Sequence, residues 1–394
     1  MRMPLYVVRN FFNDYFTPFV LSFDAKIDTL FFFITFAVVN LKMKEMKKKI
    51  NKLSVFCITA IVGCLICSCN PEDDPITPTP VDPTPEPSQT HIYVAGIENP
   101  YGDCGPAVCW QDGVMQTLDA GFYAMAKAVC VKGNDIIYGG KDEENHPVIW
   151  KNGVKQVLAT GNGCVNDLKV VNNKVYAAGE LDGQAAYWVD GVVTLLPTDP
   201  DALGYTFVGE AIFVNGNDVY VAGNTMAYLD ARGAYLWKNS NIQRLSDKVS
   251  KACDVCVNNN NVYVVGSESY TEGNIQKAVM WTNGTIQDVQ VTTNNGLSSE
   301  ASSIAIVNGQ PYVVATGWVG TAYQGAYKGF VWQNGVTSNL NCSNPQDVFV
   351  YNGDVYVVGF DKSDWGNKPM LLKNNSKIAL TPSTEGVAFA VYVK

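Results

Sequence analysis

Short runs in which apolar and polar residues alternate fill most of the chain, and these runs recur in a fixed order. From residue 91 to the C-terminus, one unit is repeated seven times at intervals of 38–49 residues. Every copy has a run of the Val-Tyr-Val-Ala-Gly type, followed by a run that ends in a large apolar residue. The tyrosines of the first run are Tyr93, Tyr138, Tyr176, Tyr220, Tyr263, Tyr312 and Tyr356. The large residues of the second run are Trp110, Trp150, Trp188, Trp237, Trp281, Trp332 and Leu372. Alternation with a period of two predicts half-buried β-strands.

Each repeat predicts four strands. In the second copy they cover residues 128–131, 135–138, 148–150 and 154–158. Dipeptides of the Asn-Gly and Gly-Asn type separate strands one and two and strands three and four, and they accept the positive φ angles of tight hairpins. The two longer connections then lie on the opposite edge. The sequence therefore predicts an all-β, seven-bladed β-propeller of four-stranded antiparallel blades, with one uniform and one variable face.

The two ends of the repeat region predict how the ring closes. The region starts with a second strand, residues 91–96, and ends with the apolar run 388–393. Aligned with residues 252–257, this last run is a first strand, and its distance from Leu372 matches the spacing in the other copies. We therefore expect the C-terminal strand to complete the N-terminal blade, which removes an exposed sheet edge.

The order of strands and turns resembles the blade of WD-repeat propellers, in which the innermost strand comes first. The resemblance covers residues 91–394 in layout only, because the Gly-His and Trp-Asp pairs of that family are absent. The run Ile136-Ile137-Tyr138-Gly139-Gly140 is similar to the double-glycine strand of Kelch repeats, but the other six copies lack it. The resemblance implies a propeller fold and no particular partner.

Residues 46–69 resemble a bacterial lipoprotein signal. A lysine-rich stretch precedes the apolar run 53–67, and Ile66-Cys67-Ser68-Cys69 is similar to the lipobox that ends at a lipid-modified cysteine. This resemblance implies lipid attachment at Cys69 and a place at the bacterial outer membrane or cell surface. Cys64 fits the same pattern but would leave an apolar terminus. A membrane-spanning anchor over residues 53–69 is the other alternative, although such a segment is at the short limit for spanning.

Two further segments flank this signal. Residues 1–45 fit none of these elements, and because Met46 or Met43 would open a signal of ordinary length, we expect translation to start there. Residues 70–90 contain seven prolines together with Thr, Asp and Glu. Such a segment has no core to form, so we expect an extended stalk between the anchor and the propeller at residues 91–394.

The charge of the chain argues against one class of partner. After Cys69 the chain carries 19 Lys/Arg and 33 Asp/Glu. Nucleic-acid binding needs clustered basic residues, so we expect no nucleic-acid partner. The stalk, the anchor and the lack of an enzyme motif favour a surface-displayed binding protein for a glycan, peptide or protein. A polysaccharide hydrolase or lyase and a scaffold subunit of an outer-membrane complex are the alternatives.

No catalytic motif is recognisable, and the sequence predicts no catalytic residue or cofactor. His91 and His146, the two histidines of the body, are interpreted as surface residues. Glycosidase chemistry needs only two convergent carboxylates, so acids predicted in the variable-face connections are the candidates if the protein is a hydrolase. These acids are Glu98, Asp103, Glu143, Glu180, Asp182, Asp230, Asp361 and Asp364.

Aromatic residues in three consecutive blades predict a ligand site on the variable face. They lie in the connections 317–329, 361–369 and 97–106. An exposed aromatic platform beside a few acids is the usual composition of a sugar-binding site. The alternative is that the rings fold back and pack locally. The predicted ligand-binding residues are Trp318, Tyr323, Tyr327, Trp365, Tyr101, Asp361 and Asp364.

Three aspartates occupy equivalent places on the predicted innermost strands. Asp167, Asp254 and Asp347 each precede an aliphatic residue of the first strand. Together they could ring the axial channel and hold a divalent cation. Their commoner use would be to accept backbone N–H bonds that tie neighbouring blades together.

The cysteines predict no disulfide framework. Seven follow Cys69, an odd number with no repeat-wise pattern. Cys253 and Cys256 are three positions apart on one predicted strand, which places them on opposite faces. We expect them to be core thiols.

Overall fold

The computed structural model describes residues 89–98, 105–227, 230–269, 275–291, 297–321, 324–362, 366–382 and 385–394. All of them belong to one compact unit, Pro85–Lys394. They form 28 β-strands and no helix, so this part of the chain has no helical segment that could cross a membrane. Cys69, the predicted signal and residues 70–88 of the predicted stalk lie outside the described residues.

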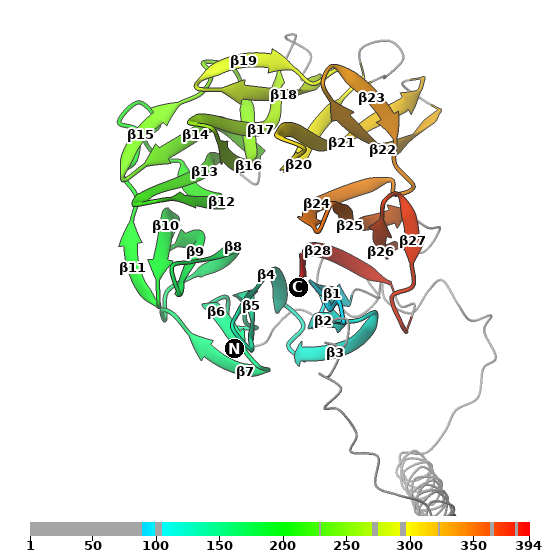
Figure 1. Cartoon of the computed structure of the whole chain (residues 1–394). Coiled ribbons are helices and arrows are strands. Elements are labelled where there is room, and N and C mark those ends of the chain that lie inside the picture. Colours follow the sequence, from blue (N-terminus) through cyan, green and yellow to red (C-terminus); the bar gives the residue numbers. More distant parts are fainter. Residues whose placement is uncertain are drawn as a thin grey trace, which may run out of the picture. The chain divides into compact units, whose positions relative to one another are not determined.

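Seven four-stranded antiparallel sheets are arranged around a central axis, which confirms the predicted propeller (Figure 1). In each blade the strand nearest the axis comes first in the list that follows. Blade 1 contains β28 (Gly386–Val393), β1 (Ile92–Glu98), β2 (Ala107–Gln111) and β3 (Val114–Asp119). Blade 2 contains β4 (Met125–Lys132), β5 (Asp135–Lys141), β6 (Pro147–Lys151) and β7 (Val154–Val157). Blade 3 contains β8 (Gly163–Val171), β9 (Lys174–Leu181), β10 (Gln184–Val189) and β11 (Val192–Leu195).

The remaining blades repeat this order. Blade 4 contains β12 (Thr206–Asn215), β13 (Asp218–Ala227), β14 (Asp230–Lys238) and β15 (Asn241–Arg244). Blade 5 contains β16 (Ser250–Asn258), β17 (Asn261–Ser269), β18 (Gln276–Thr282) and β19 (Thr285–Asp288). Blade 6 contains β20 (Ser299–Val307), β21 (Gln310–Gly320), β22 (Gly325–Gln333) and β23 (Val336–Asn339). Blade 7 contains β24 (Asn344–Tyr351), β25 (Asp354–Lys362), β26 (Asn367–Lys373) and β27 (Ser376–Ile378).

The C-terminal strand closes the ring as predicted. β28 pairs with β1 from Ile92 opposite Val393 to Glu98 opposite Gly386. The pairing continues one residue further, because His91 N donates to Lys394 O (2.8 Å) and Lys394 N donates to His91 O (3.1 Å). The inner edge of the first blade is therefore supplied by the end of the chain.

Tight hairpins lie on one face of the ring, also as predicted. Asn152 (φ 50°) and Gly153 (φ 80°) form the turn between β6 and β7, and the same pair of positive φ values recurs in other blades. These φ values are those of a type I′ turn, in which glycine and asparagine carry little strain. The longer connections consequently reach the other face, which we call the variable face.

Tryptophans fill the space between blades. Trp281 of blade 5 is fully buried and packs in one cluster with Tyr220 and Leu236 of blade 4. Trp150, Trp188 and Trp237 are buried in the same way. Burying a large apolar side chain contributes about 1.5–3 kcal/mol, so each blade depends on its neighbour for much of its stability.

The prediction placed one tyrosine wrongly by one position. In the other blades the large residue of the third strand lies opposite the residue after the tyrosine, as Trp237 does opposite Val221. In blade 2, Trp150 lies opposite Tyr138 itself. Ile137 therefore occupies the place that the tyrosine has elsewhere, while Gly140 keeps the place of the glycine opposite the bulge.

Candidate functional site

Every innermost strand carries a β-bulge at the same height. The pairing of first and second strands skips one residue in each blade, for instance Lys127 between Ala126 and Ala128. The skipped residues all line one cavity on the axis, of about 90 Å³. We call them the axial ring: Lys127, Asn166, Glu210, Cys253, Ser302, Gln346 and Phe389.

A glycine in the second strand accompanies the bulge. The residue opposite the start of the bulge is glycine in six blades, for instance Gly266 opposite Ala252. A Cβ on Gly266 would lie 1.8 Å from the carbonyl oxygen of Lys251, and the equivalent distance for Gly179 is 1.9 Å. The glycine thus lets the first strand approach closely where it bulges. The bulge, in turn, turns an extra side chain toward the axis.

The axial ring opens onto the variable face through a cavity of about 300 Å³, where charges of both signs meet. Lys127 Nζ donates to Asn166 Oδ1 (3.1 Å), and Asn166 Nδ2 donates to Glu180 Oε2 (3.1 Å). Burial alone would lower the pKa of Lys127, but Cys164, Glu210 and Glu180 outweigh it and raise this pKa. Burial, together with the charge of Glu210, raises the pKa of Glu180.

A second ion pair lies in the same cavity of about 300 Å³, which we call the axial mouth. Lys251 Nζ is 2.8 Å from Glu300 Oε1. Cys253 and Glu300 raise the pKa of Lys251, so this lysine stays protonated at neutral pH. The lining of the axial mouth thus includes charged groups, amides and a hydroxyl, all close to the axis. A ligand there would meet directed polar groups, which is how small-molecule and peptide sites obtain specificity.

The three axial aspartates tie neighbouring blades together. This confirms the alternative prediction that they accept backbone N–H bonds from the next blade. Ile212 N donates to Asp167 Oδ2, Ile304 N to Asp254 Oδ2 and Val391 N to Asp347 Oδ2, each at 2.9 Å. Each bond runs from one innermost strand to the next. A cation at these aspartates stays a prediction; Lys169 Nζ, 3.3 Å from Asp167 Oδ1, already supplies one positive charge there.

A serine links two of these aspartates. Ser303 Oγ lies 2.7 Å from Asp254 Oδ2 and 3.1 Å from Asp347 Oδ1. One hydroxyl proton can serve only one of the two carboxylates. Burial is the main cause that raises the pKa of Asp254 to about 7, and it also raises the pKa of Asp347. The pair therefore tends to hold a proton near neutral pH.

Below the aspartates, on the face of the tight hairpins, the channel widens into an apolar cavity of about 380 Å³. Its wall includes Val171, Phe213, Ile306, Phe349 and Tyr392. The two ends of the channel therefore differ in chemistry: one is polar and lies under the variable connections, and the other is largely apolar.

The predicted aromatic site is described only in part, since Tyr101, Tyr323, Trp365 and Asp364 lie outside the described residues. Trp318 and Tyr327 were predicted in a loop, but they lie in strands and face each other across extensions of β21 and β22. Their rings meet edge to face, with centroids 5.1 Å apart, and Trp318 Nε1 donates to Thr321 O (2.8 Å). Trp318 is thus half-buried by local packing, whereas Tyr327 stays exposed.

Asp361 was also expected in a loop but lies in β25. Its Oδ1 accepts hydrogen bonds from the backbone and hydroxyl of Ser343 (2.7 and 2.8 Å), and its Oδ2 lies 3.2 Å from Lys377 Nζ. Glu98, Glu180 and Asp230 likewise lie in strands. The strands of this protein extend further toward the variable face than the sequence pattern indicated, because hairpin pairing continues past the apolar core.

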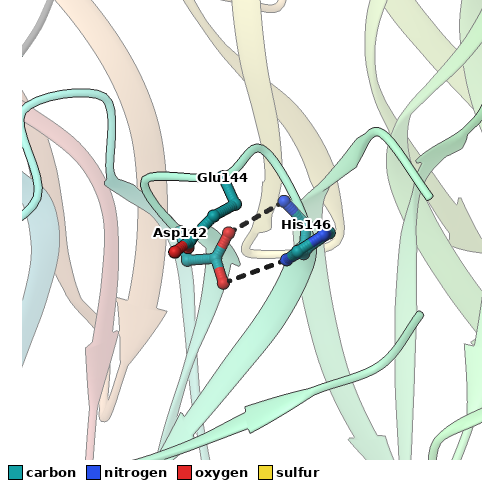
Figure 2. A group of neighbouring side chains, drawn as sticks. All are labelled: Asp142, Glu144 and His146. Atoms are coloured by element: carbon teal, nitrogen blue, oxygen red, sulfur yellow. Dashed lines mark hydrogen bonds and ion pairs between the residues drawn. The ribbon is translucent and has the colours of Figure 1, made fainter. Parts of the chain in front are cut away.

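A group of potential metal ligands lies in the turn between β5 and β6. Asp142, Glu144 and His146 bring ligand atoms within 4.8 Å of one another (Figure 2). Asp142, however, accepts a hydrogen bond from His146 N (2.9 Å) and lies 3.5 Å from Lys155 Nζ. Burial would raise the pKa of Asp142, but His146 and Lys155 lower it. This carboxylate is already balanced by an ammonium and closes the hairpin. His146 is therefore half-buried rather than free on the surface.

The described cysteines are free thiols. Cys256 is buried, as predicted, and burial raises its pKa to about 12. Cys253 is not a core residue, because the bulge turns it into the axial ring. The strict alternation assumed for this strand fails at the bulge.

Sequence reasoning missed most of the axial ring. It identified residues that follow the bulge, such as Asp254 and Asp347, but not Lys127, Glu210 or Gln346. The available signal was the glycine of the Val-Tyr-Val-x-Gly run, which marks the point where the first strand must bulge.

No protein-family model matches the chain, and no curated protein is significantly similar to it. Several solved structures share its fold. TolB from Acinetobacter baumannii is 10% identical with a TM-score of 0.43, over 77% of this chain and 66% of TolB. An acylaminoacyl peptidase from Pyrococcus horikoshii is 13% identical with a TM-score of 0.44, over 75% of this chain and 51% of the peptidase. AztD from Citrobacter koseri is 11% identical with a TM-score of 0.36, over 77% of this chain and 97% of AztD. The chain spans less than two thirds of the first two proteins. Likenesses this distant carry no argument about function, and the chain is thus a seven-bladed β-propeller whose role must be inferred from its own residues.

Proposed function

We propose that this protein is a lipid-anchored, extracytoplasmic binding protein that holds a glycan, peptide or protein ligand at the axial mouth of the variable face. The observation that carries the proposal is the axial ring. Seven bulges at one height turn seven side chains toward one point, and five of those side chains are polar or charged. A bulge in every innermost strand is a local departure from regular pairing, and such departures commonly re-aim side chains at sites.

The surroundings of the mouth support a ligand of some size. A cavity of about 400 Å³ adjoins it over blades 5 to 7, and another of about 800 Å³ lies over blades 2 to 4. Both have volumes in the range of small-molecule sites, about 300–1,000 Å³. The first shares Glu300, Ser302 and Gln346 with the mouth, and the second reaches Glu180. A bound chain could therefore cross the mouth and rest on both sides of it.

Filling the mouth should abolish binding without unfolding the protein. The purified full-length chain is applied to an array of glycans and peptides, and Gln346→Trp is compared with the wild type. Gln346 lines the mouth, so a bulky ring there should weaken binding roughly tenfold or more, which corresponds to about 1.4 kcal/mol. Ala305→Trp is the matched control, because Ala305 lines the apolar cavity on the other face. Equal losses in both variants, or no binding to any arrayed molecule, would contradict the proposal.

A polysaccharide hydrolase is the second candidate, and the raised pKa of Glu180 is the observation that favours it. A general acid must keep its proton near the working pH, and a second carboxylate, here Glu210, must stand nearby. The same binding assay distinguishes the two functions when the bound glycans are examined for shortened products. A hydrolase would release products that Glu180→Gln fails to release, whereas a binding protein would leave the glycan intact.

The anchor is tested separately from the ligand. If Cys69 carries lipid, Cys69→Ala should move the protein from the membrane fraction to the soluble fraction, or leave an unprocessed precursor. Fractionation and immunoblotting of the expressing bacterium measure this shift. Cys64→Ala is the control, since it removes the competing cysteine. A membrane fraction that Cys69→Ala leaves unchanged would place the anchor elsewhere.

A further inference from the structure

The cavity of about 400 Å³ beside the axial mouth has a wall that is rich in amides and hydroxyls. It lies between the variable-face ends of β18, β20, β21, β22 and β24. The residues that line it are Gln276, Ser298, Ser299, Glu300, Ser302, Thr316, Tyr327, Asn344, Pro345 and Gln346. Glu300 is the single charged residue among them, and Lys251 neutralises it at 2.8 Å. The cavity therefore presents dipoles rather than net charge.

One of these amides lacks a partner. Asn344, the first residue of β24, is only 9% exposed, and its Nδ2 has no hydrogen-bond acceptor among the described residues. The other buried side-chain atoms in this condition are tryptophan Nε1 atoms, and none of those tryptophans lines the cavity. Leaving a buried donor unpaired costs about 1–3 kcal/mol, which an apolar residue at this place would avoid.

Neighbouring polar groups in the wall already have partners. Ser302 Oγ donates to Pro345 O (2.7 Å), and Gln276 Oε1 accepts from Ser267 Oγ (2.6 Å). Ser299 Oγ accepts from Ala278 N (3.0 Å). These bonds fix the wall, so Asn344 is set in a rigid surround. A preorganised donor of this kind binds an acceptor with little loss of conformational entropy.

Among the residues that the structure describes, one aromatic ring borders the cavity, and it is held in place on two sides. Trp318 contacts the edge of Tyr327, and Lys362 Nζ lies 5.5 Å from the centroid of the Tyr327 ring. Tyr327 is 37% exposed despite both contacts. An oriented aromatic ring beside neutral amides and hydroxyls suits the C–H faces and hydroxyl groups of a sugar.

We infer that this cavity binds a neutral sugar residue of a glycan, one hydroxyl of which hydrogen-bonds to the side-chain amide of Asn344. The inference rests on the proposed binding function and assigns it a ligand class. An anionic sugar would require an unpaired cation in the wall, and the residues that line the cavity include no lysine or arginine. Of the two ammonium groups nearby, that of Lys251 is paired with Glu300 and that of Lys362 lies over the Tyr327 ring. An apolar or a charged peptide side chain would require an apolar pocket or an unpaired charge, which the residues lining this cavity do not supply.

The test uses two substitutions that remove the donor in different ways. Asn344→Asp keeps the shape and replaces the amide NH₂ with an oxygen, while Asn344→Leu replaces the whole amide with an apolar group of similar size. Calorimetric titration of the full-length chain with neutral oligosaccharides of glucose, mannose, galactose, xylose and arabinose measures affinity. Both variants should bind the recognised oligosaccharide at least about tenfold more weakly than the wild type. The melting temperature of Asn344→Leu should not fall, because the substitution removes a buried amide donor that has no acceptor among the described residues.

The control and the alternative outcomes separate this inference from the general function. Asn241→Asp makes the same chemical change on β15, the outermost strand of blade 4, and should leave the affinity unchanged. Unchanged glycan affinity in both Asn344 variants would overturn the inference while the binding function stands. Binding of arrayed peptides but of no neutral oligosaccharide would do the same. Absence of any ligand for the wild type would overturn both.

Discussion

Deleting residues 388–394 should abolish the cooperative unfolding of the propeller. The deletion removes most of β28, including Ala388, Val391 and Val393, which are buried between blades 1 and 7. It also removes the backbone donor for Asp347. Each larger buried apolar side chain contributes about 1.5–3 kcal/mol, so the loss approaches the 5–15 kcal/mol that stabilises a typical domain. Thermal unfolding followed by circular dichroism and calorimetry should show no sharp transition.

A deletion of equal length outside the ring is the control for this result. Removing seven residues from the proline-rich stretch 70–88 eliminates none of the described strands and should leave the melting temperature unchanged. If the C-terminal deletion melted at the wild-type temperature with the same enthalpy, β28 would not be needed to close the ring.

The free energy of unfolding of the Asp254→Asn variant, measured relative to that of the wild type, should increase as the pH rises from about 4 to about 8. The pKa of this carboxyl is raised from 3.8 to about 7 in the fold. Between these values the unfolded chain loses the proton and the folded chain keeps it, so the wild type loses stability as the pH rises. Asn cannot ionise, and its side-chain amide is neutral and similar in shape to the protonated carboxyl of Asp254. One unit of pKa shift corresponds to about 1.4 kcal/mol, which sets the relative gain at up to about 4 kcal/mol.

Urea unfolding of both proteins at several pH values measures this difference. Asp354→Asn is the control with the opposite sign. Lys373 and Asn374 lower the pKa of Asp354, so that its carboxylate stabilises the fold above its ordinary pKa and the substitution should be slightly less favourable at high pH. A free-energy difference between wild type and Asp254→Asn that does not vary with pH would show that Asp254 ionises normally in the folded protein.

Much of the fold could be predicted because it is encoded in local patterns that occur seven times. The Asn-Gly turns give the hairpins, and the alternation around each tyrosine gives the second strand. Closure by residues 388–393 follows from a count of strands. Tyr138 stands one position beyond the place of the other strand tyrosines, and only its pairing with Trp150 reveals this.

The site was less predictable because it depends on departures from the regular strand. The prediction located the inner aspartates one residue beyond the axial ring, since strict alternation cannot anticipate a bulge. Asn344 has no sequence signal at all. Its burial results from the meeting of β24 with blade 6, and only the three-dimensional neighbours show that its amide lacks an acceptor.

The pairing of β28 with β1 also determines when the ring can close relative to synthesis of the chain. The first blade has three strands and an unpaired inner edge until β28 is synthesised, and β28 follows every other described strand in the sequence. Contacts between segments far apart in a chain form slowly, and an open edge can recruit other strands in the meantime. The native ring can therefore form only after the strands of the other six blades have been synthesised. A nascent chain that stops before residue 386 lacks β28 and cannot close the ring, even if blades 2 to 7 have formed.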